Sequence, residues 1–408
     1  MTLKELSFIE FDEYSKNHEL SSFYQSSYYA LIMGEKGFDY EYIGLIDEMG
    51  NIVAASLILF KQIKKNILYG YAPKGFLIDY NDENLLKKFT DLIIEYYKKK
   101  NVAFIKINPD IIVKEISDKN YNPYEQGEIK YILQKNNYLK LKNNLYFEST
   151  LPRFNAIVNL NELEYKNLKK NTRNKINKSM RKGLILEKGD ITSLNVINKM
   201  IQKNKDYCDI NINDFYNVFH KIDAIDIFLV SIDYEEFLIN SRISYDKEIE
   251  KNTFYNEKII KNPTEDNINA KMQSDLVLLA YKNDILEGTK GLKDDKKEYI
   301  AGAVVIKYNN KAYLVASTYD KTYSRHNANY FMYYNIMKQY KNDFTFFDMN
   351  GMTGDFEPTN PYHGLNQFKL GFNPTVYEYI GEHDLIVNEQ AYTYLKETNT
   401  LAKEFNKK

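Results

Sequence analysis

The feature that most constrains the fold is a succession of strands, helix and strand that occurs twice in the chain. In the first copy, apolar runs at 41–46 and 52–60 are separated by turn-forming residues, and a third run follows at 67–71. Residues 84–100 then carry apolar side chains at helical spacing, and 102–107 is again an apolar run. These patterns predict a β-hairpin, a third strand, an amphipathic helix and a fourth strand.

The same succession returns near the C-terminus. We expect strands at 298–308 and 312–318 around the turn residues Asn309 and Asn310, then a helix at 328–341 and a strand at 345–349. A unit that occurs twice indicates a duplicated architecture. The predicted fold class is therefore α+β, with two tandem acetyltransferase-like (GNAT-like) domains.

Between the two copies, residues 233–291 break the pattern with two charged helical segments around a turn that contains Pro263. The second segment places apolar residues along one side of a helix, at Ile268, Met272, Leu276, Leu279 and Leu286. An antiparallel helical hairpin is expected. The alternative is a pair of ordinary packed helices, but the weak apolar stripe of 233–261 favours an arm that projects into solvent.

The length of 408 residues exceeds what one hydrophobic core usually serves, so more than one domain is expected. The patterns place the first GNAT-like domain at 1–148 and the second at 149–232 and 296–388. The hairpin arm occupies 233–291. A C-terminal helix is predicted at 389–408.

Composition excludes several classes of protein. Charged residues make up 27% of the chain, the mean hydropathy is -0.54, and no apolar run approaches the roughly 18 residues of a membrane span. The net charge of -1 gives no overall attraction to nucleic acid. The single cysteine, Cys208, excludes an internal disulfide, and the five scattered histidines lead us to predict no metal site. The N-terminus lacks a signal-peptide pattern, so a cytoplasmic protein is expected.

Residues 348–384 concentrate turn-forming residues in a way that is typical of a functional loop. Glycines permit unusual backbone conformations there and prolines stiffen the path between them, at Gly351, Gly354, Pro358, Pro361, Gly364, Gly371 and Pro374. Lys369 follows Phe368 in a segment whose neighbours would bury it beside a pocket. A lysine in this position is expected to contact a phosphate or an oxyanion, or to belong to a buried ion pair.

This segment resembles the C-terminal signature of the Fem family of peptidoglycan bridge-forming aminoacyltransferases. The matching residues are Asp348-x-x-Gly351, Gly364-Leu365, Phe368-Lys369-x-x-Phe372 and Glu378-Tyr379-Ile380-Gly381-Glu382-x-Asp384. Three other segments agree in the same order, 23–29 (FYQSSYY), 71–75 (YAPKG) and the basic run 170–183. The resemblance covers nearly the whole chain, and it implies the same pair of GNAT-like domains with an inserted arm.

The resemblance implies an aminoacyltransferase that moves glycine, alanine or serine from aminoacyl-tRNA to the stem-peptide amine of a peptidoglycan precursor. The acceptor would be lipid II or a UDP-linked precursor, and the product would be an interpeptide bridge. No cofactor is implied, and peripheral contact with the inner membrane surface is compatible with a lipid-linked acceptor. The oligomeric state stays open.

The chemistry is aminolysis of an ester, which needs aligned substrates and stabilisation of an oxyanion. By resemblance, Lys369 supplies the fixed positive charge; the alternative is an ion pair with Glu378 or Asp348. Asp348, Glu382 and a hydroxyl of the tRNA are candidate proton acceptors, and the sequence does not choose among them. The predicted substrate-binding residues are Phe368, Tyr71, Lys74, Gly75, Asn108, Lys36, Arg173, Gly351 and Tyr379.

The sequence departs from the family pattern on the acceptor side, in the first domain. The family commonly has an acidic residue where Asn108 stands, a lysine where Met33 stands and an arginine near Ile210 or Asn211. Lys36 is a candidate replacement for that lysine, with an ordinary surface lysine as the alternative. Arg173 lies in a basic run that either attracts phosphates or forms a solvated helix face.

Two other functions are alternatives to aminoacyl transfer. An acyl-coenzyme A-dependent N-acyltransferase should carry a glycine-rich turn after a central strand, and residues 319–329 contain no glycine. A non-catalytic homologue that binds the precursor is the third hypothesis. It is motivated by the missing basic residues that would hold the precursor's diphosphate.

Overall fold

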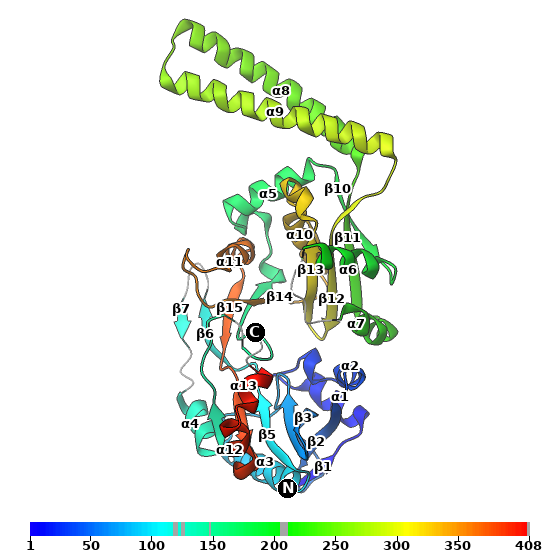
Figure 1. Ribbon diagram of the computed structural model, residues 1–408, viewed down its shortest axis with the longest axis vertical. Helices are drawn as coiled ribbons and strands as arrows, with labels where there is room; N and C mark the ends of the chain where they lie inside the picture. Colours follow the sequence, from blue (N-terminus) through cyan, green and yellow to red (C-terminus); the bar gives the residue numbers. More distant parts are fainter. Residues whose placement is uncertain (117–120, 124–126, 147, 205–210, 406–408) are drawn as a thin grey trace.

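The computed structural model describes residues 1–116, 121–123, 127–146, 148–204 and 211–405, so Cys208 and the last three residues of the predicted C-terminal helix lie outside it. Two β-sheets with helices against their faces lie one above the other, and a long helical hairpin projects from the far end (Figure 1). No helix in these ranges is long and apolar enough to cross a membrane.

The first sheet is built mainly from the N-terminal half and is antiparallel except for one parallel pair, β4 with β5. Its strand order is β1 (Thr2–Glu5), β2 (Asp39–Ile46), β3 (Ile52–Lys64), β4 (Ile67–Ala72), β5 (Val102–Ile107), β16 (His383–Ile386) and β8 (Tyr138–Lys140). The helices of this half are α1 (Phe8–Asn17), α2 (Ser27–Glu35), α3 (Glu83–Lys98) and α4 (Gly127–Lys135).

Helix α3 shows why the sequence pattern was informative. Asp82 caps its N-terminus by accepting a hydrogen bond from the backbone N–H of Leu85. The apolar stripe of the helix, Leu86, Phe89, Ile93 and Tyr97, is buried against the sheet. This helix carries the chain from β4 to β5, so the strand, helix, strand order predicted for the first copy is confirmed.

The second sheet is longer and again contains one parallel pair, β13 with β14. Its order is β10 (Leu184–Gly189), β11 (Ile225–Ile232), β12 (Tyr299–Tyr308), β13 (Lys311–Tyr319), β14 (Phe346–Met352), β9 (Phe154–Asn159), β15 (Thr375–Tyr379), β6 (Ile112–Ile116) and β7 (Tyr121–Pro123). Its helices are α5 (Lys170–Met180), α6 (Ser193–Asn204), α7 (Ile212–Phe219), α10 (Ala328–Tyr340) and α11 (His363–Leu370).

The two sheets repeat one topology. In each, an antiparallel meander leads through a helix, α3 or α10, into a strand that pairs in parallel with the last strand of the meander. The predicted fold class, α+β with two tandem GNAT-like domains and an inserted helical hairpin, is confirmed.

Strand pairing crosses the predicted domain boundaries in both directions. Strands β6 and β7, from the predicted first domain, pair within the second sheet beside β15. Strand β16, which the sequence interpretation assigned to the second domain, pairs with β5 and β8 of the first sheet. The chain passes from β15 to β16 through Gly381, whose φ of +81° lies in the region that favours glycine. Pairing between distant segments leaves no trace in local periodicity, and this is why the predicted domain boundaries do not coincide with the sheets.

The two halves share buried apolar residues. One core cluster runs from the first sheet into α7, β12 and β13 of the second half. At its centre, the ring of Phe23 packs edge-on against Phe215, Phe219 and Tyr313. The two halves therefore form one packed body, with a cavity between them.

The arm consists of α8 (Tyr234–Lys261) and α9 (Glu265–Asp294), which project beyond the second sheet (Figure 1). Asp233 and Thr264 cap the two helices through their side chains. The C-terminal region differs from the single helix predicted at 389–408. It forms α12 (Glu389–Glu397) and α13 (Thr400–Phe405), because Asn399 adopts a left-handed conformation with φ of +55° and interrupts the helix.

Candidate functional site between the two sheets

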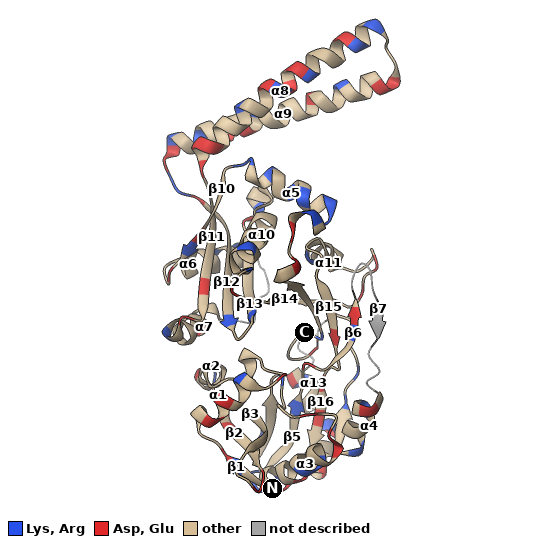
Figure 2. Cartoon of the chain, turned by 180° about the vertical axis from the view of Figure 1, so that it is seen from behind, with Lys and Arg blue, Asp and Glu red and all other residues tan. Residues whose placement is uncertain are grey.

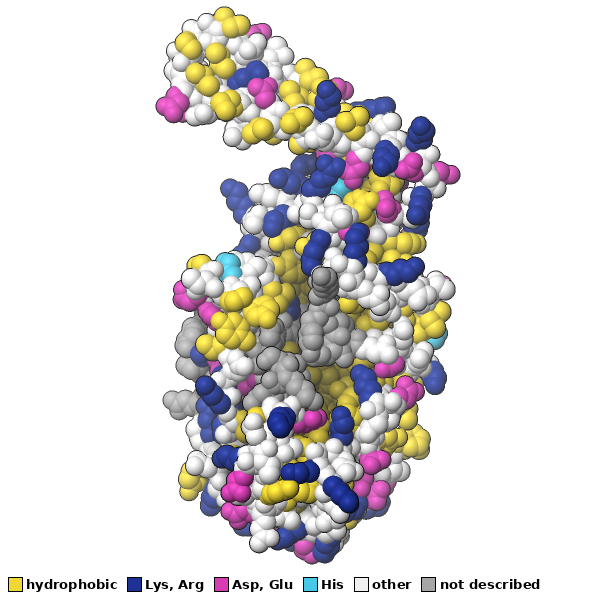
Figure 3. Space-filling view, in the orientation of Figure 1, with side chains coloured by type: hydrophobic (Ala, Val, Ile, Leu, Met, Phe, Trp, Pro, Cys, Tyr) yellow, Lys and Arg dark blue, Asp and Glu magenta, His cyan; other side chains and the backbone are white. Residues whose placement is uncertain are grey.

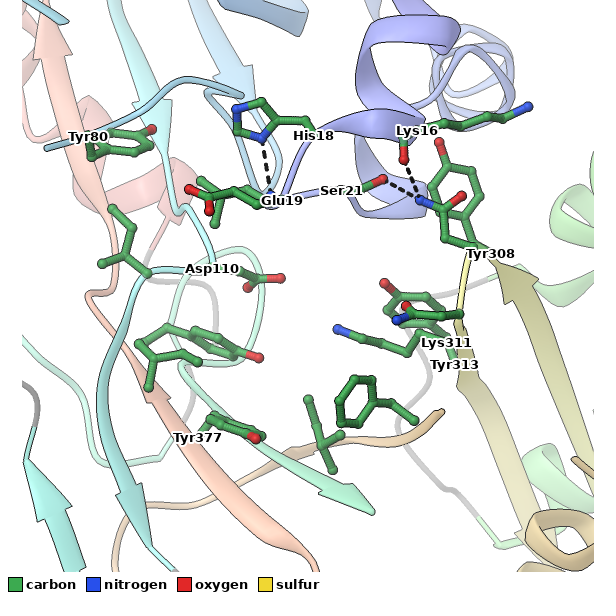
Figure 4. Close-up of a pocket in the computed structure, with 18 of the residues that line it drawn as sticks. Lys16, His18, Glu19, Ser21, Tyr80, Asp110, Tyr308, Lys311, Tyr313 and Tyr377 are labelled. Carbon is green, nitrogen blue, oxygen red and sulfur yellow. Dashed lines mark hydrogen bonds between the residues drawn. The ribbon is translucent and has the colours of Figure 1, made fainter. Parts of the chain in front are cut away.

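A cavity of about 800 Å³ lies between the two halves of the molecule (Figure 4). The first half contributes Lys16, His18 to Ser21 and Asp110, and the second half contributes Asn309 to Lys311. Tyrosine rings form much of the wall, from Tyr80, Tyr308, Tyr313, Tyr377 and Tyr379. The cavity therefore combines aromatic faces with lysine, amide and carboxylate groups, a lining suited to a partly aromatic ligand that also carries polar groups.

Lys311 and Asp110 point toward one another from opposite walls of this cavity (Figure 4). Burial would lower the pKa of Lys311, but the neighbouring Tyr313, Asp348 and Asp110 outweigh it and raise this pKa above its ordinary value. Its ammonium group is therefore a fixed positive charge inside the cavity. The sequence interpretation did not select Lys311. The alternation of β13, which places Lys311 and Tyr313 on one face, was the available signal.

Asp110 also holds Lys74, a residue that was predicted to bind substrate. The Nζ atom of Lys74 lies 2.7 Å from Oδ1 of Asp110 and 4.5 Å from the ring centroid of Tyr379. The side chain of Lys74 is buried. Burial, together with the nearby carboxylates Asp110 and Asp348, raises the pKa of Tyr379 well above its ordinary value, so this ring remains neutral. The structure thus brings together the predicted residues Lys74 and Tyr379 and adds Asp110.

Asn108, Tyr71 and Glu382 form a hydrogen-bonded network that continues from Lys74. The backbone N–H of Lys74 donates to Oδ1 of Asn108 at 2.8 Å. The amide of Asn108 donates to the hydroxyl groups of Tyr71 at 3.5 Å and Thr150 at 3.2 Å. Thr150 in turn donates to Glu382 through both its backbone N–H and its hydroxyl group. Four predicted site residues, Tyr71, Lys74, Asn108 and Glu382, are therefore linked.

Two further cavities border this network. A cavity of about 220 Å³ is lined by Tyr71 and Thr150, together with Met33 and Tyr29. A cavity of about 570 Å³ is lined by Glu382, Lys106 and Asp384. Lys106 is 1% exposed, and its Nζ atom lies 2.9 Å from Asp384 and 3.5 Å from Glu382. The sequence interpretation passed over Lys106, although a lysine inside the apolar strand 102–107 was a visible signal.

Lys369, the predicted catalyst, lies at the end of α11 with its side chain buried. Its Nζ atom donates to three backbone carbonyls, those of Met349 at 2.7 Å, Asn350 at 3.0 Å and Gly351 at 2.6 Å. An ammonium group has three N–H donors, so these carbonyls use all of them. Burial lowers the pKa of Lys369 to about 8, and the charge of Asp348 opposes that shift. Lys369 does not line the 800 Å³ cavity.

Asp348 and Gly351, also predicted, lie in the same cluster as Lys369. The carboxylate of Asp348 accepts hydrogen bonds from the backbone N–H of Asn350 at 2.8 Å and from Asn155 at 3.1 Å. A Cβ atom on Gly351 would lie 2.3 Å from Cγ of Pro152, so the close approach of these two segments requires glycine. The cluster fixes the carboxyl end of β14. The charge of Asp348, in the same strand, raises the pKa of both Lys311 and Tyr379.

The remaining predicted residues lie apart from the cavity walls. Gly75 packs closely on Gln25 and Ser56, where a Cβ atom would lie 2.9 Å and 3.0 Å from their side chains. Lys36 is exposed at the C-terminus of α2. Phe368 packs edge-on against Tyr330, Tyr333 and Phe372. Arg173, within the basic helix α5, donates to the carbonyl of Lys166.

Comparison with known proteins gives matches along almost the whole chain. The model of the FemAB family matches residues 6–400. A protein of Staphylococcus epidermidis named lipid II:glycine glycyltransferase is 23% identical over 370 residues, which covers 85% of this chain and 84% of that protein. Aminoacyltransferase FemA of the same species is 23% identical over 422 residues and covers 97% of this chain and 98% of its own. The crystal structure of FemX has a TM-score of 0.72 at 19% identity, over 97% of this chain and 100% of that one.

Proposed function

The chain belongs to the FemAB family, and on that basis we propose that it transfers an amino acid from aminoacyl-tRNA to the stem-peptide amine of a peptidoglycan precursor. Its relatives are named as an aminoacyltransferase and as a glycyltransferase acting on lipid II, so the predicted enzyme class, an aminoacyltransferase, is confirmed. The proposed product is one residue of an interpeptide bridge. The relatives' names favour a lipid-linked acceptor.

The observation that carries the proposal is the tyrosine-lined cavity between the two sheets (Figure 4). The 3′ end of a charged tRNA is single-stranded, and unpaired bases stack on aromatic rings while lysines contact the phosphates. Tyr308, Tyr313 and Tyr377 provide such rings, and Lys311 provides a positive charge. A volume of about 800 Å³ accommodates a terminal nucleotide with its aminoacyl group.

Exposed lysines on α5 provide a second, sequence-independent contact for phosphates. Figure 2 shows several Lys and Arg positions, coloured blue, along this helix. The chain as a whole has a net charge of -1, so the attraction is local to this surface. Binding of tRNA is therefore expected to weaken as the salt concentration rises.

The reaction joins the amine nitrogen of the acceptor to the carbonyl carbon of the ester. The bond from that carbon to the ribose oxygen breaks, the amine loses a proton, and the ribose oxygen takes one up. Negative charge develops on the carbonyl oxygen in the tetrahedral intermediate, where a nearby fixed cation is stabilising. Lys311 is the cation that faces the cavity, with Lys74 behind Asp110.

Asp110 is the candidate proton acceptor that the geometry adds to Asp348 and Glu382. Its carboxylate faces the cavity (Figure 4). Asp348 does not line the cavity and accepts hydrogen bonds from Asn155 and Asn350. Glu382 accepts hydrogen bonds from Ser149 and Thr150. We therefore assign Asp348 and Glu382 to positioning, with Asp110 taking the proton.

The catalytic role of Lys369 stays a prediction, and its contacts support a different part in the reaction. Since its three N–H groups donate to the carbonyls of Met349, Asn350 and Gly351, the lysine is proposed to hold the end of β14 and so to position Asp348. In this role Lys369 fixes the position of Asp348, whose charge raises the pKa of Lys311 and Tyr379 in the cavity wall.

The direct test is a transfer assay with the purified full-length chain. Labelled glycine, alanine and serine, each on its tRNA, are incubated with lipid II and, separately, with a UDP-linked precursor. Label in the precursor and release of uncharged tRNA are the expected results. The absence of transfer from all three charged tRNAs to both precursors would reject the proposed function. Thermal stabilisation by coenzyme A but by neither substrate would instead favour an acyl-coenzyme A-dependent enzyme.

A variant pair locates the reaction in the cavity. Lys311→Met removes the charge that faces the cavity and is expected to lower kcat by about 100-fold or more, the usual effect of losing one transition-state donor. Lys188→Met removes an exposed lysine from β10, where it pairs with Asp226, and serves as the control. Equal activity in the two variants would place the chemistry elsewhere.

A further inference from the structure

The arm has its polar and apolar faces in an unusual arrangement. Where α8 and α9 meet, they share polar contacts: the hydroxyl group of Ser274 donates to Glu248 at 2.8 Å, and Asn252 donates to Ser274 at 3.1 Å. Further along, Gly288 lies so close to Leu238 that a Cβ atom would be 3.2 Å away. The helices therefore pair without using the apolar stripe of α9.

That apolar stripe faces solvent. The sequence placed five residues along one side of the helix, and all five are between 41% and 62% exposed: Ile268, Met272, Leu276, Leu279 and Leu286. Figure 3 shows hydrophobic side chains on the surface of the arm. Met272, Leu279 and Leu286 recur at intervals of two helical turns, so they lie in one row that spans about 21 Å at roughly 1.5 Å per residue. An exposed row of this kind marks an interaction surface.

We propose that this stripe of α9 binds the same stripe on a second copy of the chain, with the two α9 helices antiparallel. A two-fold axis at Leu279 places that residue against its own copy. Met272 then lies opposite Leu286, because the two are equally far from the axis along the helix. Both copies use the same surface, so the interface is isologous and the assembly stops at a dimer.

The charges at the two ends of α9 favour this antiparallel arrangement. The N-terminal end carries the exposed Glu265 and Asp266, and the C-terminal end carries the exposed Lys290 and Lys293. Glu265 and Lys293 are equally far from Leu279 along the helix, so an axis at Leu279 places them opposite one another. A parallel arrangement would bring like charges together at both ends, so the charges select one orientation.

The charge of the whole arm argues against the two other obvious occupants. Residues 234–294 contain nine Lys and Arg against twelve Asp and Glu, a net charge of -3. RNA and anionic lipid surfaces attract segments of net positive charge, whereas the net charge of the arm is negative. The five stripe residues, at roughly 100 Å² each on two copies, would bury about 1,000 Å², the lower bound for a specific interface. A reversible, concentration-dependent dimer is therefore expected.

The base of the arm is held firmly, so a dimer formed through it has a defined geometry. Asp284 of α9 is buried and lies 2.5 Å from Lys182, and Arg325 contacts both Asp284 and Glu287. The arm lies at the far end of the molecule from the first sheet (Figure 1). Association through the arm leaves the cavity between the sheets open, so the inference does not depend on the proposed function.

Sedimentation of the full-length chain over a concentration series tests the proposal. The wild-type chain is expected to show a monomer–dimer equilibrium. Leu279→Glu places two like charges at the axis and should raise the dissociation constant by at least about 30-fold, the effect of losing a central contact. Ile260→Glu alters an exposed residue of α8 outside the stripe and should leave the equilibrium unchanged. Circular dichroism verifies that both variants keep their helices.

The position of the axis has its own test. Leu279→Lys should also be monomeric, and an equimolar mixture of Leu279→Glu with Leu279→Lys should restore the dimer, since opposite charges then meet at the axis. A wild-type chain that stays monomeric up to about 100 μM, a concentration at which the proposed dimer should be populated, rejects the proposal. So does a Leu279→Glu variant that dimerises like the wild type. Binding to anionic vesicles that Leu279→Glu abolishes, without a dimer in solution, would overturn the proposal and assign the stripe to a lipid surface instead.

Discussion

The ammonium nitrogen of Lys74 lies 2.7 Å from Oδ1 of Asp110 and faces the ring of Tyr379 at 4.5 Å. Lys74 follows β4 and Asp110 follows β5, both in the first sheet, while Tyr379 ends β15 in the second. One buried cation thus contacts both halves of the molecule beside the cavity. The halves are joined at this point by charge as well as by apolar packing.

Replacing Asp110 by asparagine should destabilise the protein. The ammonium group of Lys74, which is 4% exposed, would lose the carboxylate that compensates its charge. We expect a loss of about 2 kcal/mol in the free energy of unfolding, below the range for fully buried pairs because the Asp110 side chain is 20% exposed. Urea denaturation measures it. Glu95→Gln, which breaks the exposed pair with Lys99, should change stability by less than about 0.5 kcal/mol, and an equally large effect there would contradict the argument.

Activity should fall as the pH rises through about 8. The pKa of Lys369 is lowered to about 8 by burial, and its neutral form has too few N–H groups for three carbonyls. Stability should not fall with it. The group's ordinary pKa is 10.5, so between pH 8 and 10.5 the unfolded chain keeps a proton that the folded chain has lost, and unfolding becomes less favourable as pH rises. A pH–rate profile and a parallel series of unfolding curves test the two halves of this prediction.

Lys140 provides the control for that profile. Burial also lowers its pKa to about 8, and its Nζ atom donates to the carbonyl of Ile380 at 2.6 Å. We expect Lys140→Gln to retain the alkaline decline with an apparent pKa near 8. If the decline disappears in this variant, Lys140 and not Lys369 is the group that titrates.

A methyl group at Gly351 should be costly, whereas one at Gly364 should not. A Cβ atom on Gly351 meets Pro152 at 2.3 Å, and nothing lies within 4 Å of a Cβ atom on Gly364. Gly351→Ala is expected to lower the free energy of unfolding by about 2 kcal/mol through overpacking. Gly364→Ala, within α11, should raise it by about 0.5 kcal/mol. Thermal unfolding compares the two, and a similar loss in both variants would show that the contact with Pro152 relaxes easily.

Asp284→Asn should loosen the base of the arm. Lys182 is largely buried, its pKa is lowered by burial, and Asp284 is its carboxylate partner at 2.5 Å. We expect faster amide hydrogen exchange at the C-terminal end of α9 and a decrease of about 2 kcal/mol in the free energy of unfolding. Asp275→Asn breaks an i,i+4 pair with Lys271 on the arm surface. This control variant should change neither the hydrogen exchange of α9 nor the free energy of unfolding. Unchanged exchange in Asp284→Asn would mean that packing alone holds the arm.

Local patterns predicted the elements well because the forces that specify them are local. The apolar run 102–107 became β5 at the same bounds, and the turn at Asn309 and Asn310 separates β12 from β13. The exchange of strands between the two sheets was not predicted, because it depends on contacts between segments that are distant in the sequence. The partner of β16 is β5, which lies in the other half of the sequence, and nothing in either segment specifies the other.

The site was only partly predictable for a related reason. Resemblance located Lys74, Asn108 and Glu382, which the structure joins in one network. It also directed attention to Lys369, whose partners are backbone carbonyls and therefore have no signature in the sequence. Lys311 was not predicted as a site residue, because a lysine at the start of a strand is usually exposed. Only the opposing half of the molecule encloses it.

The exchange of strands has a consequence for synthesis on the ribosome. Strands β5 and β8 flank β16 in the first sheet, yet β16 follows every strand of the second sheet along the chain. Until the ribosome has made all of the second sheet, the N-terminal half carries an open sheet edge, the kind of surface that recruits other strands. Emergence of β16 closes that edge, so the part of the polypeptide made first matures only after the part made later.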